Sequence, residues 1–271
     1  VQNKYFSSWI IWFYFFPMPG GRLTLIIMLI NLCFFFFNKN IWKIKKLGII
    51  IIHTGGILLL VGGGVTAMFS SEGNMVIDEG TQSNYVEDYY YMELAVINVT
   101  ATDFDDYIIF DQPLLNRDKI LSHENFNFEI EVVKYFENCL PEKRSSMAGI
   151  QYRGMLKNFM LTELKQEKEN NLNRPGLIYK INNTGTSVDG IYGIFLGQTV
   201  PQTISVNNQN YVITLRRQRI YLPFSIELLD FKKVLYPGTE IAKSYSSEIN
   251  LLEHGAARRI LIQMNEPLRY K

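Results

Sequence analysis

Residues Leu47–Phe69 read LGIIIIHTGGILLLVGGGVTAMF, a long apolar run without a formal charge. At about 1.5 Å per residue, an α-helix of this length can cross a hydrocarbon core about 30 Å thick. Gly55, Gly56 and the run Gly62–Gly64 would be unusual in a buried helix of a water-soluble protein. Glycine is commoner in membrane helices, where it permits close backbone approach. The stretch therefore predicts a transmembrane helix over residues 47–69.

A second apolar run, Leu23–Phe37, precedes it and reads LTLIIMLINLCFFFF. Gly20 and Gly21 can extend it, and Arg22 can reach the membrane interface along its aliphatic stem, so we predict a second span over about residues 20–37. Residues 6–16 are rich in aromatic side chains but too short to cross. They predict an interfacial segment leading into the helix.

The loop between the two spans fixes the expected orientation. Residues 38–46 contain Lys39, Lys43, Lys45 and Lys46, and an excess of lysine places a short loop on the cytoplasmic side. Acidic residues follow the second span instead. Residues 1–69 are thus predicted as a membrane region in the cytoplasmic (inner) membrane, multi-pass, with residues 70–271 forming a large domain on the periplasmic or extracytoplasmic side.

The remaining chain, roughly 200 residues, is long enough to bury its own core. Short apolar and β-branched runs separated by turn residues predict a mostly antiparallel β domain, either a sandwich or barrel-like. The predicted strands are Met75–Ile77, Met92–Val99, Tyr107–Phe110, Phe126–Tyr135, Leu177–Ile181, Ile191–Leu196, Thr203–Val206, Tyr211–Arg216, Phe224–Val234, Ser247–Leu252 and Arg258–Met264. Met147–Glu169 is rich in helix formers and predicts one α-helix, after which the domain could divide near Asn170.

Composition excludes several function classes. A net charge of +1 gives no reason to expect a nucleic-acid partner. The two cysteines, Cys33 and Cys139, fall in different regions and predict two unpaired thiols. No nucleophile elbow, phosphate-binding loop or metalloprotease motif is present, so we predict no independent catalytic site. The chain begins with Val and stops after a strand-like segment, and we expect it to be truncated at both ends.

His53 is the most informative side chain, because it is the one titratable group inside the predicted span 47–69. An ionisable residue at that depth is costly and suggests a function. Neutral imidazole is a good ligand for iron, and Thr54, Gly55 and Gly56 beside it would leave room for a flat molecule or a neighbouring helix. A histidine that hydrogen-bonds another helix only to pack it explains the residue equally well.

Other polar groups give weaker signals. His123 and His254 each stand beside a glutamate without a second nitrogen or sulfur ligand at metal spacing, which is typical of surface histidines. The basic run Arg216-Arg217-Gln218-Arg219 fits a solvated strand end, with contact to lipid headgroups or to porphyrin propionates as the alternative.

Several motifs together resemble the ResB (CcsB) family of cytochrome c biogenesis proteins. The resemblance rests on the order and spacing of the following segments: Ser7-Ser8-Trp9, His53-Thr54-Gly55-Gly56 with the apolar run to Gly64, Leu222-Pro223-Phe224-Ser225-Ile226-Glu227-Leu228, Phe231, Tyr236-Pro237-Gly238-Thr239, Ser244–Ile249 and Ile262–Lys271. The likeness covers nearly the whole chain and is least clear over residues 104–210.

The resemblance implies a subunit that carries haem across the membrane and presents it for covalent attachment to apocytochrome c. In that family a histidine in the span ligates haem, and His53 matches it as the cofactor-binding and metal-binding residue. The implied partners are a CcsA (ResC)-like membrane protein, separate or fused, together with apocytochrome c and membrane lipid. The tryptophan-rich haem-binding motif, which the partner carries, is absent here, so haem would be shared with the partner. At most, the chain is part of a haem-lyase (synthetase) complex.

The alternative is a membrane-anchored scaffold, in which the β domain binds a partner protein and His53 ligates nothing. A membrane-bound enzyme ranks third, since no catalytic constellation is visible in the sequence.

Overall fold

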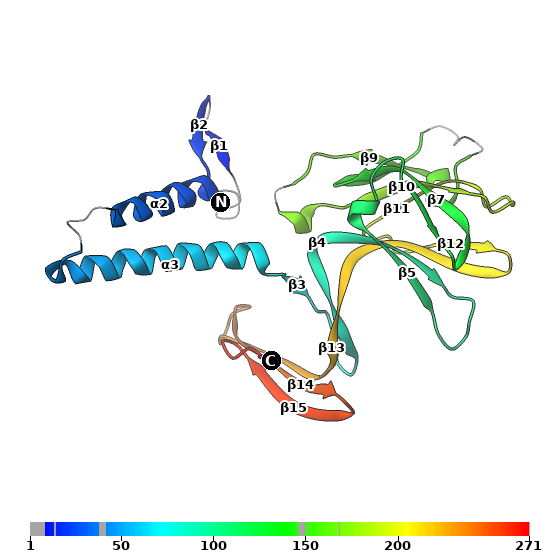
Figure 1. The fold of residues 1–271 in the computed structure, drawn as a ribbon. Coiled ribbons are helices and arrows are strands. Elements are labelled where there is room, and N and C mark those ends of the chain that lie inside the picture. The colour runs from blue at the N-terminus through cyan, green and yellow to red at the C-terminus, as the bar shows by residue number, and fades with distance from the viewer. Residues whose placement is uncertain are drawn as a thin grey trace. The chain divides into compact units, whose positions relative to one another are not determined.

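The computed structural model describes residues 9–13, 15–37, 42–145, 149, 151–167 and 169–270. The chain forms two compact units, Val1–Ser71 and Glu72–Lys271. The first unit contains the apolar helices and the second contains the β structure (Figure 1).

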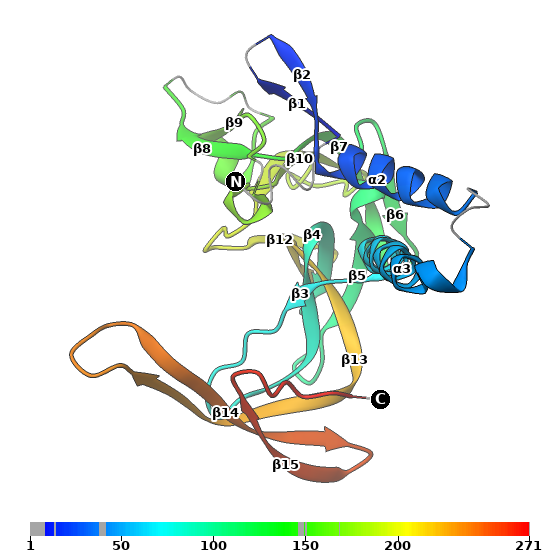
Figure 2. The ribbon, with the colours of Figure 1, turned by 90° about the vertical axis from the view of Figure 1, so that its left-hand side faces the viewer.

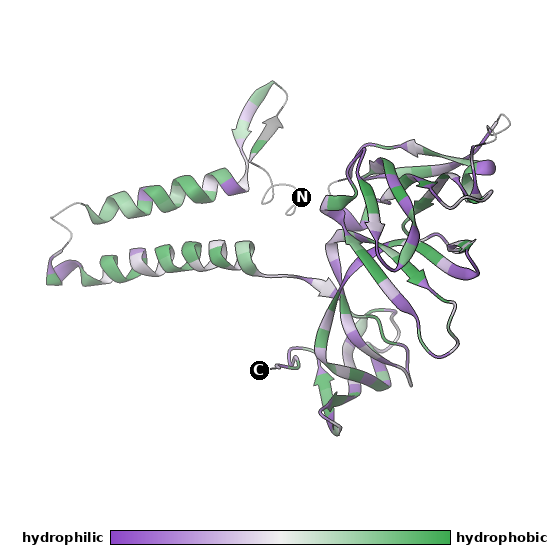
Figure 3. Ribbon diagram, turned by 45° about the vertical axis from the view of Figure 1, so that its right-hand side comes forward, coloured by the Kyte–Doolittle hydropathy of each residue, from purple (hydrophilic) through white to green (hydrophobic). Residues whose placement is uncertain are grey.

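Two helices make up most of the first unit. Helix α2 spans Gly21–Phe36 and helix α3 spans Leu47–Phe69, directly after the short 3-10 helix η2, Ile44–Lys46. Within the described residues, Ile44–Phe69 is the one helical segment long and apolar enough to cross a membrane, judged by length and composition. Helix α2 is apolar but has 16 residues, about 24 Å. Figure 3 shows both helices coloured hydrophobic over most of their length.

Helix α3 exposes apolar side chains along its length. None of its side chains is buried, and Leu58 and Leu59 are 67% and 78% exposed. Exposed apolar surface on this scale is costly in water and favourable against lipid or another apolar helix.

A β-hairpin lies where the interfacial segment was predicted. Strands β1, Ile10–Phe13, and β2, Phe16–Pro19, pair antiparallel, and Gly20 donates its N–H to the carbonyl oxygen of Trp9 at 2.8 Å. Residues 6–8 and 14 of the predicted segment lie outside the described residues, as do residues 38–41 of the predicted cytoplasmic loop.

The second unit is antiparallel β structure, as predicted. Its named strands are β3 Gly73–Asn74, β4 Gln82–Asn98, β5 Asp106–Asp111, β6 Ile120–His123, β7 Phe126–Phe136, β8 Cys139–Lys143, β9 Phe159–Glu163, β10 Gly176–Asn182, β11 Gly190–Phe195, β12 Gln202–Val206, β13 Gln209–Leu235, β14 Ala242–Glu253 and β15 Ala256–Gln263. They form a four-stranded sheet in the order β11-β10-β7-β6, a seven-stranded sheet built on β15-β14-β13-β4-β3 with β12 and β5 added, and the pair β8-β9.

A sandwich forms where the four-stranded sheet faces part of the larger sheet. Alternate residues of β13, Tyr211, Ile213 and Leu215, are buried, as strand geometry requires for one face turned inward. The shared core is formed by buried side chains from both sheets, including Leu94, Val96, Phe110, Phe128, Ile130, Val132, Leu177, Tyr179, Ile181, Ile194 and Ile204. This arrangement is the sandwich alternative of the sequence-based prediction.

The second half of β13 leaves the sandwich and forms an arm with β14 and β15, visible below the sandwich in Figures 1 and 2. The pairing of β13 with β4 shifts register between Tyr221 and Ile226. Pro223 lies in this bulge, where its missing N–H costs no ladder hydrogen bond. The two runs predicted as separate strands, Tyr211–Arg216 and Phe224–Val234, are therefore one bulged strand.

The predicted α-helix over Met147–Glu169 is wrong for the residues that the structure describes there. They form a 3-10 turn, η4 Gly154–Lys157, and strand β9, with a second turn, η5 Asn170–Leu172, following. Gly154 has φ +53°, which a right-handed helix cannot contain. Backbone pairing of β9 with β8 and burial of Leu161 outweigh the helix propensity of this segment. The described part of the second unit thus has no α-helix.

The sandwich core makes a first prediction. Ile213→Ala removes a fully buried side chain and should lower the free energy of unfolding by about 2–5 kcal/mol, through lost burial and the cavity left behind. Ile220→Ala, on the same strand but 37% exposed, should cost clearly less. Urea unfolding of the detergent-solubilised chain, followed by tyrosine fluorescence, measures both, and equal losses would contradict a core built around Ile213.

Candidate functional site

His53 lies near the start of α3 and is half-buried. Its Nδ1 is 2.9 Å from the carbonyl oxygen of Ile49, one turn earlier on the same helix. A carbonyl oxygen only accepts, so Nδ1 carries the proton and donates it. In a neutral imidazole the other nitrogen, Nε2, then holds the free lone pair. That nitrogen can ligate a metal, and the backbone hydrogen bond sets the tautomer in the way that hydrogen-bond partners of metal-ligating histidines do.

The ring of His53 also stacks on Phe35 of α2. The two ring centroids are 3.9 Å apart and the planes differ by 13°. This contact holds the plane of the imidazole and covers one of its faces, leaving the ring edge as the route to Nε2. The stack joins the last turn of α2 to the beginning of α3, so it also stabilises the packing of the two helices. Both interpretations of His53 therefore find support in its contacts.

The glycines beside His53 have different surroundings. A Cβ built on Gly56 would lie 3.5 Å from Cδ1 of Leu32, so Gly56 allows α2 to approach. A Cβ built on Gly48, Gly55 or Gly62 meets no described atom within 4 Å. These three glycines recur every seven residues and share one face of α3, away from the side on which His53 meets Phe35. The predicted space for a neighbouring helix is thus used by α2 at Gly56, whereas the face at Gly55 is open.

Aromatic residues and lysines surround the end of the helix pair where His53 lies. Phe35 and Phe36 contact edge to face, and Phe36 contacts Trp42, whose indole N–H donates to the Phe36 carbonyl oxygen at 3.0 Å. Lys45 and Lys46 form the last residues of η2. Aromatic rings together with lysines are typical of a membrane–water interface.

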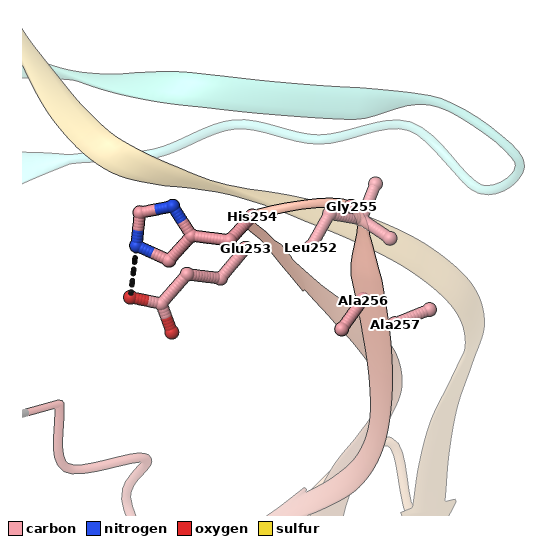
Figure 4. Close-up of a pocket in the computed structure, with 6 residues that line it drawn as sticks. All are labelled: Leu252, Glu253, His254, Gly255, Ala256 and Ala257. Atoms are coloured by element: carbon pink, nitrogen blue, oxygen red, sulfur yellow. Dashed lines mark ion pairs between the residues drawn. The ribbon is translucent and has the colours of Figure 1, made fainter.

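The other two histidines lie in turns of the β unit. His123 accepts a hydrogen bond on Nδ1 from the N–H of Asn125, 3.2 Å away, in the turn between β6 and β7. His254 lies in the turn between β14 and β15 with its Nε2 3.7 Å from Oε1 of Glu253, and Figure 4 shows this pair at an open depression lined by residues 252–257. Among the described residues, no three histidine, cysteine, aspartate or glutamate side chains gather to hold a metal ion.

The tip of the β14–β15 turn is too open to enclose a ligand. The His254 side chain is 90% exposed, and its backbone has φ +48°, followed by Gly255 at +80°. Such a pair of positive φ angles builds a two-residue hairpin turn. Tyr270 donates its hydroxyl proton to the same carboxylate oxygen of Glu253 that faces His254. The residues therefore have a local structural role in closing the hairpin and fixing the C-terminal segment.

The two thiols are both free and separate. Cys33 is exposed on α2, and Cys139 is buried at the start of β8. Burial raises the pKa of the Cys139 thiol to about 11, although the guanidinium of Arg174 partly opposes the shift. A thiol with that pKa stays protonated at neutral pH and is a poor nucleophile.

The basic run Arg216-Arg217-Gln218-Arg219 lies in the middle of β13, and its contacts are with the protein. Arg216 donates from Nε to Oε1 of Glu93, 2.7 Å away on β4, and the two side chains are 13% and 4% exposed. Arg219 lies over the ring of Tyr85, with its Nε 3.6 Å from Oε1 of Glu87. Arg217 donates to the carbonyl oxygen of Tyr89, and Gln218 donates to Asp111. The solvated strand end predicted for this run is wrong, because the run is inside the sheet.

The Glu93–Arg216 pair was missed by sequence reasoning because the two residues are far apart in the chain. They are direct cross-strand neighbours in the β4–β13 register. Glu93 also accepts the backbone N–H of Arg219 at 3.3 Å, where the register of the ladder shifts. The pair thus fixes the sheet at the point where it bends.

A second prediction concerns this pair. Arg216→Ala leaves the Glu93 carboxylate buried without its charge partner and should lower the free energy of unfolding by about 3–5 kcal/mol. Arg258→Ala, on the exposed face of β15, should change it by less than about 0.5 kcal/mol. Urea unfolding measures both, and a small effect of Arg216→Ala would show that the carboxylate is relieved by water or by another cation.

Comparison with known proteins adds no family. A search against protein-family models found no match for this chain, and a search of curated proteins found none either. The assignment to ResB-like proteins therefore stays a prediction that rests on the motifs and on the chemistry of His53.

Proposed function

We propose that this chain is a subunit of a cytochrome c assembly complex in the cytoplasmic membrane, where it ligates haem through Nε2 of His53 and passes it outward. The observation that carries the proposal is the hydrogen bond from Nδ1–H to the Ile49 carbonyl oxygen. This hydrogen bond leaves Nε2 of His53 with a free lone pair on a long apolar helix. A histidine nitrogen with a free lone pair is the group that binds haem iron as an axial ligand. Haem is the cargo of such a complex, so its ligation by His53 is transient.

Two apolar helices support the proposed membrane placement. Helix α3 crosses the bilayer, and α2 forms a second, shorter span together with Gly20 and Phe37. In this orientation Lys43, Lys45 and Lys46 face the cytoplasm, and the β unit after Ser71 lies on the extracytoplasmic side of the membrane. With this orientation His53 is near the cytoplasmic end of α3, where haem would enter.

A partner completes the coordination in this proposal. His53 is one ligand, and the other two histidines of the chain belong to the β unit. The open face of α3 at Gly48, Gly55 and Gly62 suits close packing of another membrane helix. A CcsA (ResC)-like protein fits this role and would supply the second axial histidine. The covalent bonds then form between haem vinyl groups and the thiols of apocytochrome c, so this chain supplies position and not a nucleophile.

A second candidate is a membrane-anchored scaffold, and the stack of His53 on Phe35 favours it. In that case the imidazole serves to join α2 to α3, as a polar group bonded within its own helix and packed on an aromatic ring. The two candidates differ in whether Nε2 binds iron.

A third prediction separates them. The full-length protein is purified with its partner from a haem-sufficient host as wild type, His53→Ala and His53→Cys. The wild type should carry a bound-haem absorption spectrum, His53→Ala should lose it at equal protein yield, and His53→Cys should shift the Soret band because thiolate replaces imidazole. His254→Ala is the matched control and should keep the wild-type spectrum, because that side chain lies on the β unit.

The scaffold predicts other results. If His53 only packs, His53→Ala and Phe35→Ala should lower thermal stability by similar amounts while the haem content stays the same in all variants. Haem bound equally by the wild type and His53→Ala, or by neither, would exclude ligation by His53.

A further inference from the structure

The turn that joins β13 to β14 exposes an apolar cluster on the β unit. We define the hairpin tip as residues 231–245, which project beyond the end of β15 in orange in Figure 2. Six large apolar side chains of this tip are exposed, namely Phe231, Val234, Leu235, Tyr236, Ile241 and Tyr245. Ile241, at the far end, is 66% exposed. The sandwich core does not use them, and a group of exposed apolar side chains is typical of a surface that meets a partner or a membrane.

The tip is a well-formed turn. Tyr236, Pro237, Gly238 and Thr239 form a β-turn in which the Thr239 N–H donates to the Tyr236 carbonyl oxygen at 3.1 Å. Proline at the second position and glycine with φ +75° at the third are the features of a type II turn. The Ile241 carbonyl oxygen accepts the Tyr236 N–H at 3.0 Å, and the Ile241 N–H reaches the Thr239 hydroxyl at 3.2 Å. The exposed side chains are therefore held on a fixed frame.

Positive charge accompanies the apolar side chains. The tip contains Lys232, Lys233 and Lys243 against one acidic residue, Glu240. Lys232 pairs with Asp230 at 2.6 Å, just outside the tip. Tyrosine and phenylalanine combined with lysine suit a bilayer interface, where rings enter the headgroup layer and ammonium groups contact anionic lipid.

Two hydrogen bonds join the base of the hairpin tip to the segment that follows α3 in the chain. The Glu79 carboxylate accepts the Phe231 N–H at 2.7 Å, and the Gly80 N–H donates to the Leu228 carbonyl oxygen at 2.8 Å. The base of the tip is thus bonded to a segment that follows α3 closely in sequence. From Phe69 to Glu79 the chain spans at most about 35 Å when fully extended.

We infer that the hairpin tip inserts into the lipid headgroup layer on the extracytoplasmic face of the cytoplasmic membrane, where it contacts anionic phospholipid. The inference rests on the membrane crossing of α3 in the proposed function and is independent of haem. Because the base of the tip is bonded to the segment that follows the membrane crossing, the bilayer is an apolar surface that the tip can reach, and the lysines match the charge of anionic lipid. Insertion would give the β unit a second attachment to the membrane and limit its rotation about the residues after α3.

The test uses spin labels on the full chain in vesicles of phosphatidylcholine and phosphatidylglycerol. Single cysteines are introduced at Ile241, at His254 in the other hairpin turn, and at Leu59 of α3, all in a Cys33→Ser background. Cys139 is retained because it is 1% exposed, and a sample without an added cysteine checks that it stays unlabelled. Collision with oxygen, which concentrates in lipid, is compared with collision with a water-soluble nickel chelate.

The label at position 241 should collide more with oxygen than with nickel, as at position 59, and the label at 254 should show the reverse. Replacing phosphatidylglycerol by phosphatidylcholine should move position 241 toward water. Equal nickel access at positions 241 and 254 would overturn the inference while position 59 still reports lipid. A label at 241 that is immobilised and shielded from both reagents would overturn it in favour of a protein partner. Access of the nickel chelate to position 59 would contradict the membrane crossing of α3, and therefore both the proposed function and the insertion of the hairpin tip.

Discussion

The ladder between β4 and β13 is the interaction on which the rest of the β unit depends. Strand β13 contributes alternate side chains to the sandwich core in its first half and pairs with β14 in its second half. Its backbone bonds to β4 run through both parts, with register shifts after Arg217 and Tyr221. Each shift bends the sheet and adds local twist. Without this ladder, the arm would be a three-stranded ribbon with little core, and the sandwich would lose a central strand.

Sequence reasoning predicted the parts that depend on local pattern. The apolar run 47–69 identified α3, and alternation identified the core strands β7, β10 and β11, because each signal lies within a few consecutive residues. The turn residues between the predicted strands include Asn207-Asn208 and His254-Gly255, and all four have positive φ. Strands β3, β6, β8 and β9 were missed because they are short and supported by their neighbours more than by their own pattern. The strand predicted over Met75–Ile77 is wrong, because these residues follow β3 without strand structure.

The candidate site could be predicted only in part. The depth of His53 in an apolar run made it a candidate, but its contact with Phe35 depends on how α2 packs, which no local pattern gives. The basic run at 216–219 was interpreted from its charge, whereas its carboxylate partners come from β4 and β5. The helix predicted over 147–169 failed for a related reason, since pairing between β8 and β9 overrides the intrinsic preference of the segment. Long-range pairing is the common element in all three.

The distance along the chain between Glu93 and Arg216 has a consequence for synthesis. The two residues are 123 positions apart, yet they face each other across one ladder. During biosynthesis the edge of β4 that pairs with β13 therefore stays unpaired until most of the chain has been synthesised. Over the same period the Glu93 carboxylate lacks the Arg216 guanidinium. Contacts of such long range slow folding and lengthen the exposure of strand edges. The nascent unit is thus a natural client for a chaperone, and premature release should favour aggregation through β4.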